Sequence, residues 1–267
     1  MKVSQILLFL TLPITVVSIV LMCIAFGAYD PVISDYFPRG TVFPALAIGV
    51  ACLAFAVGVS GVIVSKKMHF PLYLPKTPSF APIPAALGSL ASAVFLFISG
   101  KPIIGVLFLL AAGFFALTVA PFAKEKAALI TWVGFASVIA CIALNATYYF
   151  DMTVEMNAPV KVLLQIGLLA AMLGCTAEIR ILIGRSHFVL TPVLPLLAMI
   201  ACLFSAFPVF ALAAESKTPT MVYTAAVPFL LGFGTTAGCR LMQITFPQSF
   251  DAPELQTDEK DMGEQNK

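Results

Sequence analysis

Eight long apolar runs alternate with short polar segments along the chain. Each run is continuous and nearly free of charge, and an α-helix needs about 20 such residues to cross roughly 30 Å of hydrocarbon. The runs lack the period-two alternation of barrel strands, and a helix satisfies its own backbone hydrogen bonds in lipid. The pattern therefore predicts an all-α fold, a polytopic membrane helix bundle of about eight transmembrane helices. The predicted spans are residues 6–28, 41–64, 83–99, 103–120, 127–149, 160–183, 188–211 and 221–244.

Two parts of this assignment have alternatives. The first span ends on small residues, as a signal peptide does, but its apolar stretch of about 22 residues exceeds the 7–15 of a signal sequence. The third and fourth spans are short and meet at Gly100-Lys101-Pro102, where glycine and proline favour a break. A tight helical hairpin is expected there. The alternative is a re-entrant pair, and both arrangements leave the flanking segments on one side.

The composition excludes a water-soluble globule. Of the 267 residues, 60% are hydrophobic and 10% are charged, and the mean hydropathy is +1.02. A soluble domain carries about 25% charged residues, so the bilayer itself is the expected partner. The net charge of +2 gives no reason to expect nucleic acid. The six cysteines lie singly inside apolar runs and are interpreted as small buried hydrophobic residues, so no metal or other cofactor is expected.

The distribution of lysine and arginine predicts the orientation, because cytoplasmic loops are enriched in both. Counted with the adjoining span ends, the connections after odd-numbered spans hold four of them, Arg39, Lys101, Lys161 and Lys217. The start of the chain and the corresponding positions after even-numbered spans hold nine when Lys260 and Lys267 of the distal tail are left out, namely Lys2, Lys66, Lys67, Lys76, Lys124, Lys126, Arg180, Arg185 and Arg240. We therefore expect a cell-membrane protein with both termini in the cytoplasm.

The chain is expected to have two parts. Residues 1–246 form the transmembrane domain, and residues 247–267, with six acidic side chains and two lysines, form an acidic cytoplasmic tail without fixed structure. Two short matches also suggest an internal duplication. Asp30 precedes Arg39 and the second span much as Asp151 precedes Lys161 and the sixth. Two four-span halves of the same orientation, a 4+4 parallel repeat, would follow.

Glu178 is the only acidic residue inside a predicted span. Met172 marks the middle of the sixth span, and Glu178 lies six residues beyond it. Glu178 is therefore about 9 Å from the centre of the bilayer. A carboxylate at this depth is costly unless it faces protein or water. Arg185 lies on the same helical face, and Arg180 can extend toward the interface. Glu178 is either a ligand-contacting or ion-coupling residue, or one half of a structural ion pair.

The other end of the sixth span is also polar. Asn157 can cap a helix whose first turn contains Pro159, and Lys161 and Gln165 share a face four residues apart. With the end of the preceding span, these side chains could line a small polar vestibule. The alternative is ordinary capping and interfacial anchoring.

The eighth span is rich in small residues. Gly234 and Gly238 form a G-x-x-x-G pair, preceded by Gly232 and Pro228. Small residues allow helices to approach closely, which favours a packing role. Proline and glycine near mid-membrane can also mark a bend or a gate.

One segment of about 30 residues contains Asp151-Met152-Thr153, Asn157, Pro159, Lys161, Gln165 and Glu178-Ile179-Arg180. With these residues the segment resembles multi-pass bacterial membrane proteins of unassigned function. The resemblance implies a bacterial inner membrane and implies no activity.

Three classes of function remain. The favoured hypothesis is a transporter or permease-like protein for a small solute or lipid, with Glu178 as a buried polar switch and the eighth span as the flexible element. The second is a non-catalytic membrane subunit that docks on a membrane-protein partner or another copy through the small-residue faces. The third is a lipid-modifying membrane enzyme, ranked last because the sequence has no H-E-x-x-H, G-x-S-x-G, Walker or Rossmann motif.

Overall fold

The computed structural model describes residues 3–29, 36–38, 40–64, 80–119, 127–183, 190–215, 217 and 220–245. Within these residues the chain forms eight α-helices and no strand, which confirms the predicted all-α membrane bundle. Seven helices are long and apolar enough to cross a membrane, and α3 is shorter, with 16 residues. The helices are α1 (Val3–Gly27), α2 (Phe43–Val64), α3 (Ile83–Ile98), α4 (Pro102–Val119), α5 (Ala127–Phe150), α6 (Pro159–Leu182), α7 (Leu190–Ala214) and α8 (Met221–Thr245).

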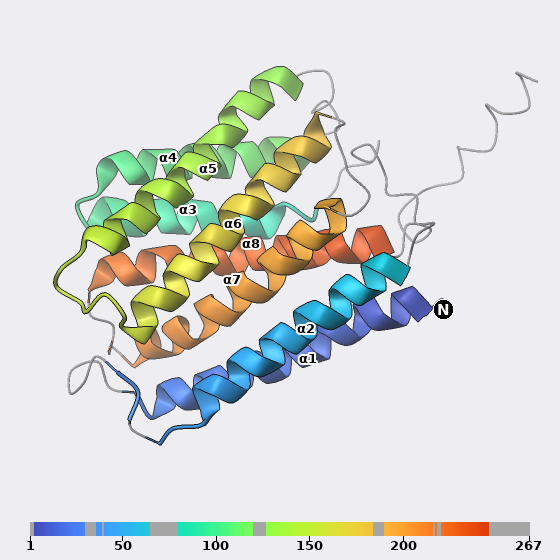
Figure 1. Ribbon diagram of the computed structural model, residues 1–267. Helices are drawn as coiled ribbons and strands as arrows, with labels where there is room; N and C mark the ends of the chain where they lie inside the picture. Colours follow the sequence, from blue (N-terminus) through green and yellow to red (C-terminus); the bar gives the residue numbers. More distant parts are fainter. Residues whose placement is uncertain are drawn as a thin grey trace, which may run out of the picture.

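Successive helices run in alternating directions (Figure 1). The last turns of α1, α3, α5 and α7 and the first turns of α2, α4, α6 and α8 lie at one end of the bundle, which we call the hairpin end. The start of α1 and the end of α8 lie at the opposite end, which we call the terminal end. An even number of helices therefore returns the chain to the side on which it began.

Helix α8 closes a ring of helices. It contacts α3, α6 and α7, while α3 to α7 also pack in sequential pairs, so that these six helices form a closed ring. The α1–α2 hairpin lies beside this ring and joins it mainly through α7 (Figure 1). Buried aromatic rings fill the space between α4 and α8, namely Phe108, Phe115, Phe229 and Phe233.

The α3–α4 connection is a tight helical hairpin. Gly100 has φ of +73°, and the amide of Lys101 donates to the Leu96 carbonyl oxygen at 2.9 Å while that of Gly100 donates to Phe97 at 3.2 Å. These are the two hydrogen bonds of a Schellman motif, which needs a residue in the left-handed region. Pro102, whose missing N–H is no loss at the first position of a helix, then starts α4.

Helices α3 and α8 cross with almost no side chain between them. A Cβ built on Gly232 would clash with the carbonyl oxygen of Pro84, and one on Gly88 would clash with that of Pro228. Two hydrogen bonds join the helices. The Ala85 amide donates to Thr236 Oγ1 at 3.1 Å, and the Phe229 amide donates to Ser92 Oγ at 3.0 Å. The Thr236 hydroxyl thus accepts from a backbone amide near the start of α3, and the Ser92 hydroxyl accepts from the amide that follows the proline of α8.

The two sequence halves pack differently. Helix α6 lies along α7, whereas α2 and α3 form no comparable pair among the described residues, and α8 takes the place beside α3. Asp30 and Arg39, on which the proposed repeat partly depends, lie outside the described residues, as does the acidic tail. The 4+4 repeat stays a prediction from the sequence.

Candidate functional site

Glu178 of α6 forms an ion pair with Arg240 of α8. Arg240 Nε lies 3.1 Å from Glu178 Oε1 and 3.2 Å from Oε2, and Arg240 Nη1 donates to Gln243 Oε1 at 3.1 Å. The arginine side chain is 7% exposed and the glutamate side chain 8%. We call these three residues the terminal-end cluster. Because two charges removed from solvent are costly unless they are paired and hydrogen-bonded, the pair constrains how α6 and α8 can lie.

The sequence predicted a buried carboxylate but not its partner. Arg180 is exposed in the structure, and Arg185 lies outside the described residues. In the sequence, Arg240 contributes only to the positive charge of the terminal end. A depth comparison could have found it, since Arg240 lies five residues before the end of α8 and Glu178 four before the end of α6. Both are therefore about 6–8 Å inside their helix ends.

A second polar cluster joins the hairpin ends of α6 and α8. Asp151 Oδ2 accepts a hydrogen bond from Tyr223 Oη of α8 at 2.9 Å, and Oδ1 accepts from the amide and hydroxyl of Thr153 at 2.9 and 2.6 Å. Lys161 of α6 is 1% exposed, and its ammonium donates to the backbone oxygens of Asp151 at 2.7 Å and Val154 at 3.3 Å. We call Asp151, Thr153, Lys161 and Tyr223 the hairpin-end cluster.

Two tyrosine rings extend this cluster into the bundle. Tyr148 of α5 stacks on Tyr223 with ring centroids 4.9 Å apart and an interplanar angle of 8°. The Tyr148 hydroxyl donates to the Val222 carbonyl oxygen at 2.9 Å. The α5–α6 connection and the start of α8 are therefore held together by hydrogen bonds as well as by packing.

The predicted residues around Lys161 have different environments. Asn157 is exposed and Gln165 is half-buried. The prediction that Asn157 caps α6 is wrong, because Ala158 is the N-cap residue and no side chain caps it. Pro159 at the first helical position has no amide to cap and holds Ala158 in an extended conformation, with φ −57° and ψ 133°.

Small and apolar groups separate the two clusters along the α6–α8 boundary. A Cβ on Gly167 of α6 would lie 3.0 Å from Leu230 Cδ1, and one on Gly174 would lie 2.6 Å from Phe233 Cε1. Gly234 and Gly238 of α8 instead face α7, where a Cβ would meet Leu203 and Met199 respectively. These glycines are covered within the chain.

An open pocket of about 520 Å³ lies beside the hairpin-end cluster. Lys101, Thr147, Asp151, Thr153 and Thr220 supply its polar lining, from the α3–α4 turn, α5, the α5–α6 connection and the segment before α8. Within the described part of the chain, no three histidine, cysteine, aspartate or glutamate side chains come close enough to hold a metal ion.

Comparison with known proteins does not assign this chain to a family. No protein-family model, no curated protein and no solved structure matches the chain. The fold and composition define the class, an integral membrane protein built from a helix bundle.

The hairpin-end cluster predicts a pH dependence of stability. Burial raises the pKa of the Asp151 carboxyl, but hydrogen bonds from Thr153 and Tyr223 and the nearby Lys161 ammonium outweigh it and lower the pKa below its ordinary value. A lowered pKa in the folded state stabilises the protein above the unfolded pKa, about 3.9, and this contribution disappears as the pH falls through the folded pKa.

We expect the unfolding temperature in detergent to fall on acidification below about pH 4. Asp151→Asn should make this acid-dependent loss smaller. Glu155→Gln removes an exposed carboxylate from the same connection and should keep the loss unchanged. Equal acid sensitivity of the wild type and Asp151→Asn would contradict the assigned role of Asp151.

Proposed function

We propose that this protein is a permease-like carrier for a small solute or lipid, in which α8 moves against α6. The observation that supports this proposal is the position of the two polar clusters. Glu178 and Arg240 join α6 to α8 at the terminal end, and at the hairpin end Tyr223 of α8 donates to Asp151 of the α5–α6 connection, which Lys161 of α6 holds through its backbone oxygen. Between them the boundary consists of small and apolar side chains.

This distribution of contacts suits alternating access. Polar contacts at an end of the boundary can reform in water when that end opens, because hydration then compensates the separated charges. The apolar middle provides no specific bond that must break. Pro228, Gly232 and Gly234 lie between the clusters on α8, where proline and glycine allow a helix to bend. Glu178 and Arg240 would close the terminal end, and Asp151 and Tyr223 the hairpin end.

We further propose that the carrier resides in a bacterial cell membrane with the terminal end in the cytoplasm. The excess of lysine and arginine before α1 and in the sequence segments that follow α2, α4 and α6 supports this orientation. Lys101 and the hairpin-end pocket then face outward.

Cysteine labelling tests the carrier mechanism and the orientation together. Leu230 is buried in the middle of the boundary, opposite Gly167. In a cysteine-free protein, Leu230→Cys should react slowly with a membrane-impermeant thiol reagent. Neutralising the terminal-end cluster with Glu178→Gln and Arg240→Gln should accelerate labelling from that end by about tenfold or more, which corresponds to a shift of about 1.4 kcal/mol in the opening equilibrium. Asp151→Asn should accelerate the labelling of Leu230→Cys from the hairpin end.

Two reference positions make this labelling interpretable. Lys101→Cys lies in the exposed α3–α4 turn and should react whether or not the clusters are neutralised. If the orientation is correct, the reagent reaches it from outside the cell and not from the cytoplasmic side. Leu53→Cys on the lipid-facing side of α2, where Leu53 is 54% exposed, should stay unreactive. A Leu230→Cys that never reacts while Lys101→Cys does would reject the moving boundary.

A membrane subunit is the second candidate function. Its support is the α1–α2 hairpin, which packs mainly on α7 and leaves most of its apolar surface exposed. A co-purifying protein that is lost when Leu46 and Leu53, on the exposed face of α2, are both replaced by tryptophan would favour this candidate over the carrier.

A further inference from the structure

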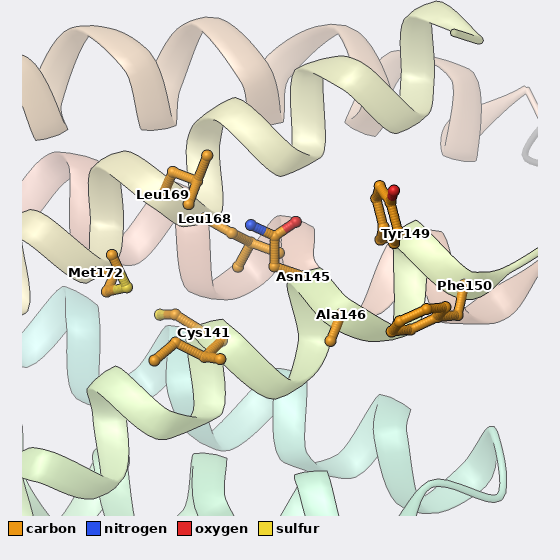
Figure 2. A pocket seen from close by; sticks show the side chains of 9 residues that line it. Cys141, Asn145, Ala146, Tyr149, Phe150, Leu168, Leu169 and Met172 are labelled. Carbon is orange, nitrogen blue, oxygen red and sulfur yellow. The ribbon is translucent and has the colours of Figure 1, made fainter. Parts of the chain in front are cut away.

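Two hollows meet on helix α5 near the hairpin end. The first is the polar pocket beside the hairpin-end cluster, and the second is an apolar groove of about 350 Å³ between α5 and α6 (Figure 2). Ala146 and Phe150 line both, so the two hollows adjoin along this edge of α5. We propose that the two hollows together bind one anionic phospholipid, with its phosphate at Lys101 and an acyl chain along the groove.

The length of the groove fits an acyl chain of one leaflet. It runs along α5 from Phe150, where the helix ends, to Cys141. Nine residues of helix correspond to about 13–14 Å. Half of the hydrocarbon thickness is about 15 Å. The groove thus begins near the interface, where Tyr149 and Phe150 stand as in an aromatic belt, and ends near the middle of the membrane.

The lining of the groove matches hydrocarbon. It is formed by Cys141, Ile142 and Tyr149 of α5 and by Leu168, Leu169 and Met172 of α6, together with the two shared residues and Asn145. Ile142, Tyr149 and Leu169 are about half exposed, with values of 51%, 51% and 48%, so the groove is open to lipid along its length. An acyl chain can therefore enter sideways from the bilayer.

The charge of the polar pocket fits a phosphate diester. Lys101 is exposed, and it lies in the wall together with the hydroxyls of Thr147 and Thr220. Asp151 is the acidic residue in the described lining, and the buried Lys161 ammonium compensates its charge. The remaining positive charge is that of Lys101, which favours a headgroup with a net negative charge.

Asn145 supplies a third point of contact. Its half-buried amide lies between α5 and α6 among apolar side chains (Figure 2). A polar amide facing hydrocarbon is costly without a hydrogen-bonding partner. Asn145 lies five residues from Phe150, about 7.5 Å deeper along the helix. An ester carbonyl at the head of an acyl chain, deeper than the phosphate, would accept a hydrogen bond there.

Lipid titration of the purified protein tests this inference, which does not depend on the carrier proposal. Delipidated protein in detergent is titrated with phosphatidylglycerol, phosphatidylcholine or glycerol 3-phosphate, and bound molecules are counted by native mass spectrometry. We expect one phosphatidylglycerol to bind most tightly. Lys101→Gln should weaken it about tenfold through the lost charge-assisted hydrogen bond. Ala146→Trp, which fills the junction of the hollows, should abolish the binding.

Matched variants separate the site from general effects. Lys217→Gln removes a lysine at the same end that pairs with Glu215 at 2.8 Å, and Ile139→Trp places a tryptophan at an exposed position of α5 outside the groove. Both should bind phosphatidylglycerol as the wild type does. Equal affinity for phosphatidylcholine together with an inert Lys101→Gln would overturn the proposal. So would glycerol 3-phosphate that binds as tightly as the lipid, or Ala146→Trp that still binds it.

Discussion

Replacing Gly232 with alanine is expected to destabilise the folded protein by about 3 kcal/mol or more, a large effect for a single methyl group. The added Cβ would lie 2.9 Å from the Pro84 carbonyl carbon and 3.2 Å from Gly88 Cα, in addition to the clash with the Pro84 oxygen. These are backbone atoms, so no side-chain rotation relieves the contact. Helices α3 and α8 must separate, which lengthens the hydrogen bonds from Ala85 to Thr236 and from Phe229 to Ser92.

The measurement is the free energy of unfolding in mixed micelles, with a second glycine as control. Beyond its chain neighbours and the backbone of its own helix, Gly49 of α2 has no atom within 4 Å of the position that an added methyl group would take, so the same change there meets open space. Alanine favours a helix over glycine by up to about 1 kcal/mol, and Gly49→Ala should therefore be neutral or stabilising. The two glycines thus predict opposite signs. A similar, small effect at both positions would show that α3 and α8 do not cross as closely as the structure has them.

The sequence predicted the helices well because length and lack of charge determine whether a segment can cross lipid. It did not predict which helices are neighbours. In a bilayer, both the lipid-facing and the protein-facing sides of a helix are apolar, so hydrophobicity does not distinguish them. Leu53 and Ala54 of α2 illustrate this, since the larger apolar side chain is 54% exposed and the smaller is fully buried. Gly88 lies where α3 and α8 cross, but the sequence does not distinguish it from other glycines, because hydrophobicity does not show which side of α3 faces another helix.

The candidate site was predictable only where polar residues enter or border the apolar layer. Glu178 was identified because an ionisable group inside a span is expensive, and Lys161 because polar residues gather at the start of the sixth span. The partner of Glu178 lies 62 residues away at Arg240 and the partner of Asp151 lies 72 residues away at Tyr223, so both pairs depend on tertiary contacts. Tyr223 resembles any interfacial tyrosine in the sequence, and only the position of the α5–α6 connection gives it a carboxylate to bind.

Breaking the Glu178–Arg240 pair from one side is expected to have the largest effect on stability. Arg240→Leu should cost about 3–5 kcal/mol, because it leaves the Glu178 carboxylate in a low-dielectric environment without its guanidinium. The double variant Glu178→Leu/Arg240→Leu should recover most of this loss, since replacing a buried ion pair by apolar groups is often nearly neutral. Arg180→Leu removes an exposed arginine two residues from Glu178 and should cost less than about 1 kcal/mol.

A double-mutant cycle of unfolding free energies measures this coupling. If the single and double variants lose stability additively, Glu178 and Arg240 do not interact as the structure indicates. The double variant also separates two roles of the pair that stability alone cannot distinguish. A purely structural pair that has been replaced by leucines leaves the α6–α8 boundary closed, so Leu230→Cys stays unreactive in the stable double variant. A pair that closes one end of a carrier favours the closed state over the open one, and its removal exposes Leu230→Cys to labelling from the terminal end even though the protein remains folded.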